Sequence, residues 1–104
     1  MSGRLITRGF ALDLLGAHTH PASGRIYHGS VILEMLDKAG ILVTLDDSTI
    51  VRLETGSWGP DQRDALLALA PFVKSGSALE WQDETERIRI TYRRGRAMLS
   101  REIV

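Results

Sequence analysis

Residues 87–93, with the sequence RIRITYR, alternate between polar and large apolar side chains. Successive side chains of a β-strand point to opposite faces, so this segment predicts a strand with Ile88, Ile90 and Tyr92 on one face and arginine or threonine on the other. Such a strand is typical of an antiparallel sheet that is packed on one side and solvated on the other. The alternation therefore predicts a sheet whose apolar face is covered and whose polar face is open.

A two-residue loop of Arg94 and Gly95 would join this strand to a last strand in residues 96–104. The segment SALEWQD, residues 77–83, is expected to add a third strand to this C-terminal meander. Residues 41–54, ILVTLDDSTIVRLE, predict a separate hairpin, because two runs rich in β-branched residues flank a polar turn. The register of the last hairpin then pairs Arg93 with Arg96, Thr91 with Met98, Arg89 with Ser100 and Arg87 with Glu102.

A helix is predicted directly after the segment GSWGP. Pro60 suits the first position of a helix, and Asp61 and Asp64 place negative charge near its positive end. Pro71 lacks an N–H group and clashes with the preceding turn, so the helix should end or kink near Ala70. The expected buried stripe of this helix consists of Leu66, Leu67, Leu69 and Ala70.

Residues 30–39 allow two interpretations. The segment is short, and Val31 and Ile32 prefer a pleated surface, which favours a strand. The alternative is a helix with Ser30 as its N-cap and Gly40 as its C-cap. If residues 30–39 form a strand, the predicted fold is one α+β domain over residues 1–104. In this fold, antiparallel β-meanders carry a single helix, at about residues 60–73, which packs on one sheet face.

Composition and charge restrict the class of function. The 104 residues include 13 basic and 13 acidic side chains, which argues against a nucleic acid or a membrane as a partner chosen by bulk charge. The absence of cysteine excludes disulfides, thiolate nucleophiles and Cys-based metal sites. The sequence shows neither the core of a signal peptide nor a membrane span. We therefore expect a soluble, cytoplasmic protein that works without a cofactor.

All three histidines fall in the segment GAHTHPASGRIYHG, residues 16–29. If residues 11–20 and 26–35 are strands joined by PASGR, then His20 pairs with Ile26 and His18 with His28, which gathers three imidazoles as in many zinc sites. Asp13, the nearest carboxylate on this strand, would lie on the opposite face, where it cannot support a ligand histidine. We expect an exposed hairpin without a bound metal, and His18, His20 and His28 are the candidates for a metal site.

The motif HTHP resembles part of the signature of the JAMM/MPN metalloproteases. That signature pairs two such histidines with a downstream Ser and Asp and an upstream Glu. Here His28 and Val31 stand at the expected positions of the Ser and the Asp, and no Glu precedes His18. The resemblance covers four residues, and the family is not assigned.

The remaining acidic residues are interpreted as turn formers. Asp46 and Asp47 are adjacent and would point to opposite faces of a strand, so they suit a turn better than an acid and base pair. The run that contains Glu80, Asp83, Glu84 and Glu86 is interpreted as a charged turn, since it lacks the spacing of a calcium loop. The sequence also lacks the motifs of serine hydrolases, P-loop proteins and dinucleotide-binding proteins.

Arginine is concentrated in the last hairpin, with Arg101 nearby, and Trp58 lies between glycine residues before the predicted helix. Guanidinium groups suit carboxylate and phosphate partners, and an exposed tryptophan can anchor an interface. We expect a small non-enzymatic binding module of bacterial or phage type, such as an inhibitor, an immunity-type protein or an adaptor, that contacts an acidic protein. The alternatives are nucleic-acid binding by the same hairpin and a metal-dependent hydrolase with the histidines. Homodimerisation through an edge strand is also open. The expected partner-binding residues are Arg87, Arg89, Arg93, Arg94, Arg96 and Trp58.

Overall fold

A computed structural model describes residues 3–15, 17–19, 24 and 26–104 of the chain. Two helices separate three groups of strands along it, and every strand pairing among these residues is antiparallel. The elements are, in order, β1 (Arg4–Arg8), β2 (Leu12–Asp13), β3 (Ala17–Thr19), β4 (Ile26–His28), α1 (Gly29–Lys38), β5 (Leu42–Asp46), β6 (Thr49–Glu54), α2 (Pro60–Ala68), the 3₁₀ turn η1 (Ala70–Phe72), β7 (Ala78–Gln82), β8 (Glu86–Arg93) and β9 (Arg96–Ile103).

The N-terminal segment joins the two larger sheets. Its first half, β1, is the edge of a four-stranded sheet with the order β1-β7-β8-β9, and its second half, β2, pairs with β6 in a three-stranded sheet with the order β2-β6-β5. The chain bends between them at Gly9, which has a φ of 55°. The buried Ser77 hydroxyl stabilises this bend, because it donates to the Gly9 carbonyl at 3.2 Å and accepts from the Ala11 N–H at 3.3 Å.

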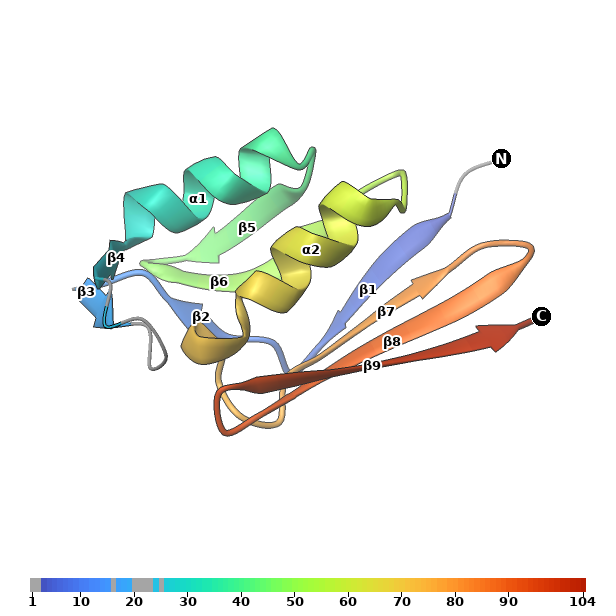
Figure 1. Ribbon diagram of the computed structural model, residues 1–104. Coiled ribbons are helices and arrows are strands. Elements are labelled where there is room, and N and C mark those ends of the chain that lie inside the picture. Colours follow the sequence, from blue (N-terminus) through green and yellow to red (C-terminus); the bar gives the residue numbers. More distant parts are fainter. Residues whose placement is uncertain (1–2, 16, 20–23, 25) are drawn as a thin grey trace.

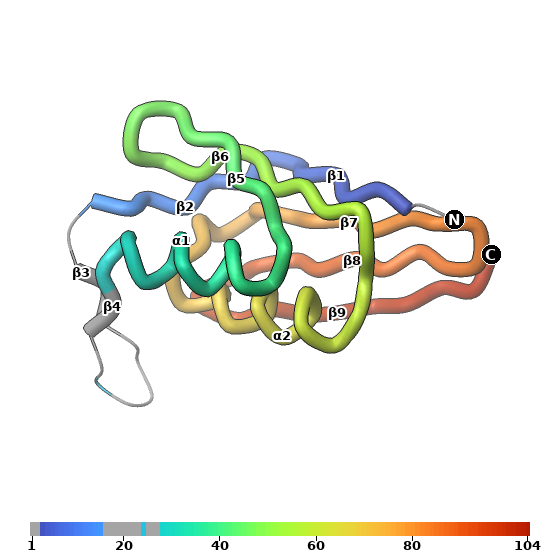
Figure 2. The backbone as a smooth tube through the Cα atoms, turned by 90° about the horizontal axis from the view of Figure 1, so that it is seen from above, coloured from blue at the N-terminus to red at the C-terminus, as the bar shows by residue number. Residues whose placement is uncertain are grey.

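Both described helices lie on the same side of the sheets (Figure 1). Seen from above, the strands form a broad layer that runs from the β5–β6 hairpin through β2 and β1 to β7, β8 and β9 (Figure 2). The core fills the space between the helices and this layer. At its centre, Tyr92 of β8 is almost fully buried, packs edge-on against Phe10, and donates a hydrogen bond to the Leu66 carbonyl of α2 at 2.7 Å.

The C-terminal meander confirms the predicted alternation and the predicted register. Ile88, Ile90 and Tyr92 are buried, and all four predicted pairs of β8 and β9 are present. The hairpin in residues 41–54 is also confirmed, with its turn at Asp47 and Ser48 between β5 and β6. The predicted helix begins at Pro60 and gives way to η1 before Pro71. In these segments local pattern and turn chemistry agree with the tertiary packing.

The prediction of a strand in residues 30–39, and with it of a single helix, is wrong. This segment is α1, and the described residues form two α-helices. Ile32 and Leu36, one helical turn apart, are both buried, whereas Val31 is 44% exposed. The helical period therefore places two large side chains in the core, and this gain exceeds the preference of valine and isoleucine for a strand.

The N-terminal end of α1 also differs from the helical alternative, whereas its C-terminal end agrees with it. The N-cap is His28, without a side-chain hydrogen bond, and Ser30 lies inside the first turn. Gly29 at the first position approaches the chain so closely that a Cβ there would lie 2.6 Å from the Leu14 carbonyl oxygen. Gly40 follows the helix with a φ of 72°, as the helical alternative predicts.

The acidic run in residues 80–86 also differs from its prediction as a single charged turn. Glu80 belongs to β7 and is 6% exposed, and Glu86 begins β8. Asp83 lies in the turn between these two strands. None of the described helices is long and apolar enough to cross a membrane.

Candidate functional site

The four-stranded sheet turns one face toward the helices and the other toward solvent. The buried residues of its strands fix which side chains lie on each face, because neighbours along a strand alternate and paired residues across strands share a face. We call the solvent side the arginine face. Its members are Arg4, Ile6 and Arg8 of β1, Ala78, Glu80 and Gln82 of β7, Arg87, Arg89, Thr91 and Arg93 of β8, and Arg96, Met98, Ser100 and Glu102 of β9.

Positive charge dominates the arginine face. Among its described residues, six arginines stand against two glutamates, although the whole chain has equal numbers of basic and acidic side chains. The compensating acidic groups lie elsewhere, for example at Glu34 and Asp37 of α1 and at Asp61 and Asp64 of α2. Folding therefore separates charge that the composition shows as balanced.

Glu80 holds three of these arginines in place. Its side chain is 8% exposed, and its carboxylate oxygens lie 3.1 Å from Arg87 Nε, 3.6 Å from Arg8 Nε and 3.9 Å from an Arg89 terminal nitrogen. Arg87 Nε is buried and, despite the short distance, its N–H makes no hydrogen bond of good geometry with the carboxylate. One carboxylate thus lies within ion-pair distance of three guanidinium groups, and its single negative charge compensates only one of their three positive charges.

The predicted partner-binding residues do not all share this face. Arg87, Arg89, Arg93 and Arg96 belong to it, and Arg94 lies in the hairpin turn beside them with a φ of 49°. Trp58 and Arg101 lie on the other side of the sheet, where both line a cleft with Ile88. The structure therefore divides the predicted patch into two separate surfaces.

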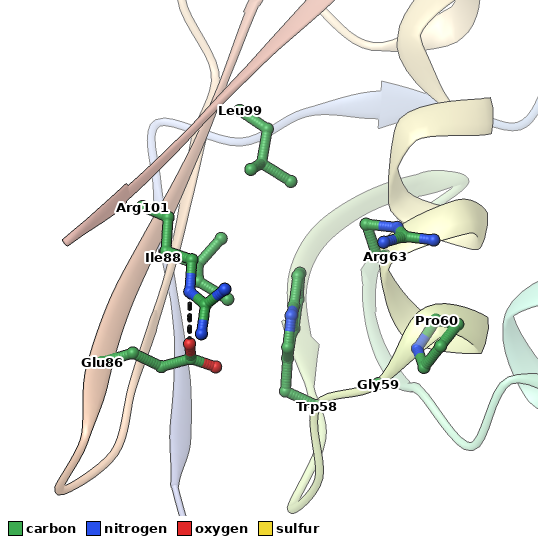
Figure 3. Close-up of a pocket in the computed structure, with 8 residues that line it drawn as sticks. All are labelled: Trp58, Gly59, Pro60, Arg63, Glu86, Ile88, Leu99 and Arg101. Carbon is green, nitrogen blue, oxygen red and sulfur yellow. Dashed lines mark ion pairs between the residues drawn. The ribbon is translucent and has the colours of Figure 1, made fainter. Parts of the chain in front are cut away.

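The second surface is a cleft between the start of α2 and strands β8 and β9, which we call the Trp58 cleft (Figure 3). It has a volume of about 350 Å³. The Trp58 ring stacks on the buried Trp81, with ring centroids 6.1 Å apart, and forms one wall. The lining residues are Trp58, Gly59, Pro60, Arg63, Glu86, Ile88, Leu99 and Arg101.

An ion pair crosses the floor of the Trp58 cleft. Arg101 Nε lies 2.6 Å from a Glu86 carboxylate oxygen, as the dashed line in Figure 3 shows. Arg63 approaches from α2 and pairs through its Nε with Asp64 at 3.2 Å. The cleft thus combines apolar walls with two guanidinium groups and one carboxylate.

Asp83 organises the turn next to this cleft. Its carboxylate accepts hydrogen bonds from the backbone N–H groups of Thr85 and Glu86, at 2.8 and 2.9 Å, from the Trp81 indole N–H at 3.1 Å, and from the Thr85 hydroxyl at 2.9 Å. These bonds, of which the Thr85 backbone bond is the largest contribution, lower the pKa of Asp83 from 3.8 to about 2. Its role is therefore to fix the β7–β8 turn and the Trp81 ring.

The histidine cluster is not assembled as predicted. The backbone register of β3 and β4 pairs His28 with Ala17 and His18 with Tyr27, so the predicted pairing of His18 with His28 is wrong by one residue. Ile26 pairs with Thr19 and not with His20, so the register of the two strands differs by one residue from the predicted one. His20 and the side chain of His18 lie outside the described residues. Within the part of the chain that the structure describes, no three His, Asp or Glu side chains are placed to hold a metal ion.

Comparison of this chain with protein families, with curated proteins and with solved structures found no significant match.

Sequence reasoning misses three charged members of the arginine face, Arg4, Arg8 and Glu80. Arg4 and Arg8 are far from the last hairpin in sequence, and Glu80 belongs both to the segment predicted as a strand, residues 77–83, and to the acidic run interpreted as a turn. The alternation RLITR in residues 4–8 is a signal for a strand with two arginines on one face. Its position beside β7, however, is set by long-range pairing that this local pattern does not encode.

Proposed function

We propose that this chain is a small binding module that acts through protein–protein contacts, and that the arginine face receives an acidic surface of its partner. The observation that carries this proposal is the group of Arg8, Arg87 and Arg89 around Glu80 on a sheet face that no described helix covers. Guanidinium groups that are gathered on one exposed face can form several charge-assisted bonds to the carboxylates of a partner.

A protein partner fits this face better than a nucleic acid. The described residues of the face include no aromatic side chain on which a base could stack. They do include the apolar Ile6, and Met98 is 72% exposed. Glu102 adds an exposed carboxylate that would repel a phosphate backbone but can pair with a basic group of a protein. Mixed charge with apolar contacts is typical of protein interfaces.

The separation of charge between the two sides of the molecule supports the same proposal. The arginine face carries six arginines against two glutamates, whereas α1 and α2 together carry four acidic and two basic side chains, so the net charge differs in sign between the two sides. Such a distribution orients a charged partner before contact and raises the rate of association.

The test compares Arg93→Glu with Lys38→Glu as bait for proteins of a nuclease-treated lysate from the source cells. Both substitutions reverse one charge, but Arg93 lies on the arginine face away from Glu80, and Lys38 lies on α1. We expect wild type and Lys38→Glu to retain the same acidic protein, and Arg93→Glu to bind it roughly tenfold more weakly.

Retention of that protein at equal strength by all three baits would contradict the proposal. A nucleic-acid function would instead show as binding of a short DNA duplex to the untagged chain, with an affinity that falls with salt at a slope of about −0.9 per neutralised phosphate. The two results separate the protein partner from its alternative.

A further inference from the structure

We infer that the free edge of β9 and the Trp58 cleft form a second binding site, which takes an extended peptide segment of another protein. The segment adds to the sheet as an antiparallel strand, with an apolar side chain opposite Leu99 and a carboxylate side chain opposite Arg101. This site is separate from the arginine face, and it goes beyond the proposed function.

Strand β9 is a long edge strand with exposed apolar side chains. It has eight residues, ends the order β1-β7-β8-β9, and pairs with β8 without any irregularity. Leu99 is 40% exposed, and Ile103 and Val104 are more than 70% exposed. The edge strand of the three-stranded sheet, β5, is shorter, and its pairing is interrupted between Thr44 and Leu45, an irregularity that hinders the addition of another strand. An uninterrupted edge with exposed apolar side chains, such as β9, is a template for another strand.

The hydrogen bonding of β9 determines which of its backbone groups are available to a new strand. The Val104 N–H donates to the Thr85 carbonyl at 2.9 Å, so the even-numbered residues of β9 bond to the preceding strand. Tyr92 of β8 fits the same alternation. It pairs with the odd-numbered Ala97, and its N–H donates to the Ser77 carbonyl, on the side of β7, at 3.0 Å. The N–H and C=O groups that point to the free edge therefore belong to Ala97, Leu99, Arg101 and Ile103.

The side chains of these same four residues lie on the cleft side of the sheet. Leu99 pairs with Ile90 and Arg101 with Ile88, both of which are buried, and Leu99 and Arg101 line the Trp58 cleft. Residues that are directly opposite in a sheet share a face. The residues of an added strand that hydrogen-bond to β9 would therefore point their side chains to the cleft side as well.

The cleft specifies the chemistry of those side chains. Its volume of about 350 Å³ and its walls of Trp58, Ile88 and Leu99 suit one large apolar side chain. Its lining carries two guanidinium groups, of which Arg101 pairs with the Glu86 carboxylate in the cleft and Arg63 pairs with Asp64 of α2. The pair with Glu86 engages Arg101 through Nε, and a guanidinium has further donors at its terminal nitrogens. A carboxylate on the added strand can pair with these terminal nitrogens of Arg101.

A second copy of this chain does not supply such a strand. The cleft-side residues of its own β9 would be Ala97, Leu99, Arg101 and Ile103, which include a guanidinium and no carboxylate. Pairing of two β9 strands would thus bring a second guanidinium group close to Arg101 without adding a carboxylate to pair with it. The charge of the cleft therefore favours a segment of a different protein.

The probe is an acetylated and amidated peptide, VTETFTV, titrated into the intact chain by calorimetry. In antiparallel register its glutamate lies opposite Arg101 and its phenylalanine opposite Leu99, so these two residues hydrogen-bond to β9 and the central threonine between them does not. N-methylation of the phenylalanine nitrogen removes a bonded N–H and should weaken binding roughly tenfold or more, whereas N-methylation of the central threonine should change it by less than about twofold.

Protein variants test the cleft itself. Arg101→Gln should weaken binding of VTETFTV but not of VTQTFTV, in which glutamine replaces the glutamate. Met98→Thr, on the opposite face of the same strand, is the matched control and should leave both affinities unchanged. Arg93→Glu should also leave them unchanged, which distinguishes this site from the arginine face.

Three results would overturn the inference. The first is the absence of saturable binding of VTETFTV at about 1 mM, the weak limit of specific recognition. The second is an equal effect of N-methylation at the two positions, which would show that the β9 edge does not bond to the peptide. The third is a stable homodimer in sedimentation that Leu99→Asp converts to monomer, which would assign the edge to a second copy.

Discussion

At the scale of single residues, Glu80 shows how a buried charge is tolerated in this sheet. Its carboxylate is removed from water but lies near three guanidinium groups that are themselves 42% to 64% exposed. The exposed partners keep much of their hydration, so each pair contributes less than a fully buried one. The main role of Glu80 is to relieve the repulsion among arginines that neighbouring strands bring together.

Replacement of Glu80 by glutamine tests this role. Glu80→Gln keeps the shape of the side chain but leaves Arg8, Arg87 and Arg89 without a counter-charge, and we expect a loss of stability of about 1 to 2 kcal/mol. The measurement is the free energy of unfolding in urea. Glu102→Gln is the control, because Glu102 is 74% exposed and lies 3.7 Å from Arg87, and its effect should stay below about 0.5 kcal/mol. Equal effects of the two substitutions would contradict this account.

Asp83 makes stability depend on pH in the acid range. Its pKa is lowered from 3.8 to about 2 in the folded chain, so folding favours its charged form. The stabilisation is complete above the unfolded pKa of 3.8 and is lost as the pH falls through the folded pKa of about 2. Asp83→Asn, which cannot ionise, should therefore show a shallower loss of stability between these two pH values than wild type.

The measurement is a series of urea unfolding curves across this pH range for both proteins. The matched control is Glu84→Gln, which removes a carboxylate from the same turn but leaves the four hydrogen bonds to Asp83 in place. If stability falls equally steeply with pH in wild type and Asp83→Asn, the turn does not lower the pKa of the Asp83 carboxyl.

At the scale of elements, α1 forms because its side chains fit the core at helical spacing. Ile32 and Leu36 enter the core, Glu34 and Lys38 form an ion pair at 3.1 Å on the exposed side, and Lys38 in the last turn suits the negative end of the helix. Val31 is left partly exposed in a conformation that restricts its side chain. It is thus the residue at which local preference and tertiary packing disagree.

This disagreement predicts an unusual effect of a valine-to-alanine substitution. Val31→Ala should stabilise the chain by about 0.3 kcal/mol, because alanine has the higher helix propensity and little buried area is lost. Val43→Ala in β5, where the valine packs against the core, should destabilise it by about 1 kcal/mol. Thermal unfolding of both variants gives the comparison. A loss of stability in Val31→Ala as large as that in Val43→Ala would argue against a helix at residues 29–38.

At the scale of the whole molecule, the arrangement of layers creates two unlike surfaces. The helices cover one side of the four-stranded sheet, so its other side remains open with its arginines (Figure 1). The cleft side combines Trp58 with an uninterrupted strand edge, whereas the arginine face is a charged plane. The net charge of zero gives no indication of this asymmetry.

The asymmetry predicts retention of a neutral protein on a cation exchanger. At pH 7 and low salt the chain should bind through the arginine face, and Arg93→Glu should elute at a lower salt concentration than Lys38→Glu, which has the same net charge. Elution of the two variants at one salt concentration would show that the arginines do not act as a separate surface.

The sequence predicted those elements for which the side-chain pattern and the turn residues indicate the same secondary structure and the same boundaries. The alternation in residues 87–93 and the two-residue loop at Arg94 and Gly95 together set the register of the last hairpin. Pro60 and Pro71 likewise set the start of α2 and its change to η1. The arginine side chains of the β8 and β9 strands, Arg101 excepted, therefore share a face that the sequence alone predicts, because the parity of a strand is a local property.

Tertiary structure alone decided the features that depend on which segments meet. Residues 30–39 have a pattern that fits either a strand or a helix, and the space beside β5 and β6 selects the helix. The partners of Glu80 come from β1 and β8, and Trp58 reaches the cleft side of β9 through the loop before α2. A local pattern determines how side chains alternate within one element, but only packing determines which faces touch, because the gain from burial depends on the surface that the rest of the chain supplies.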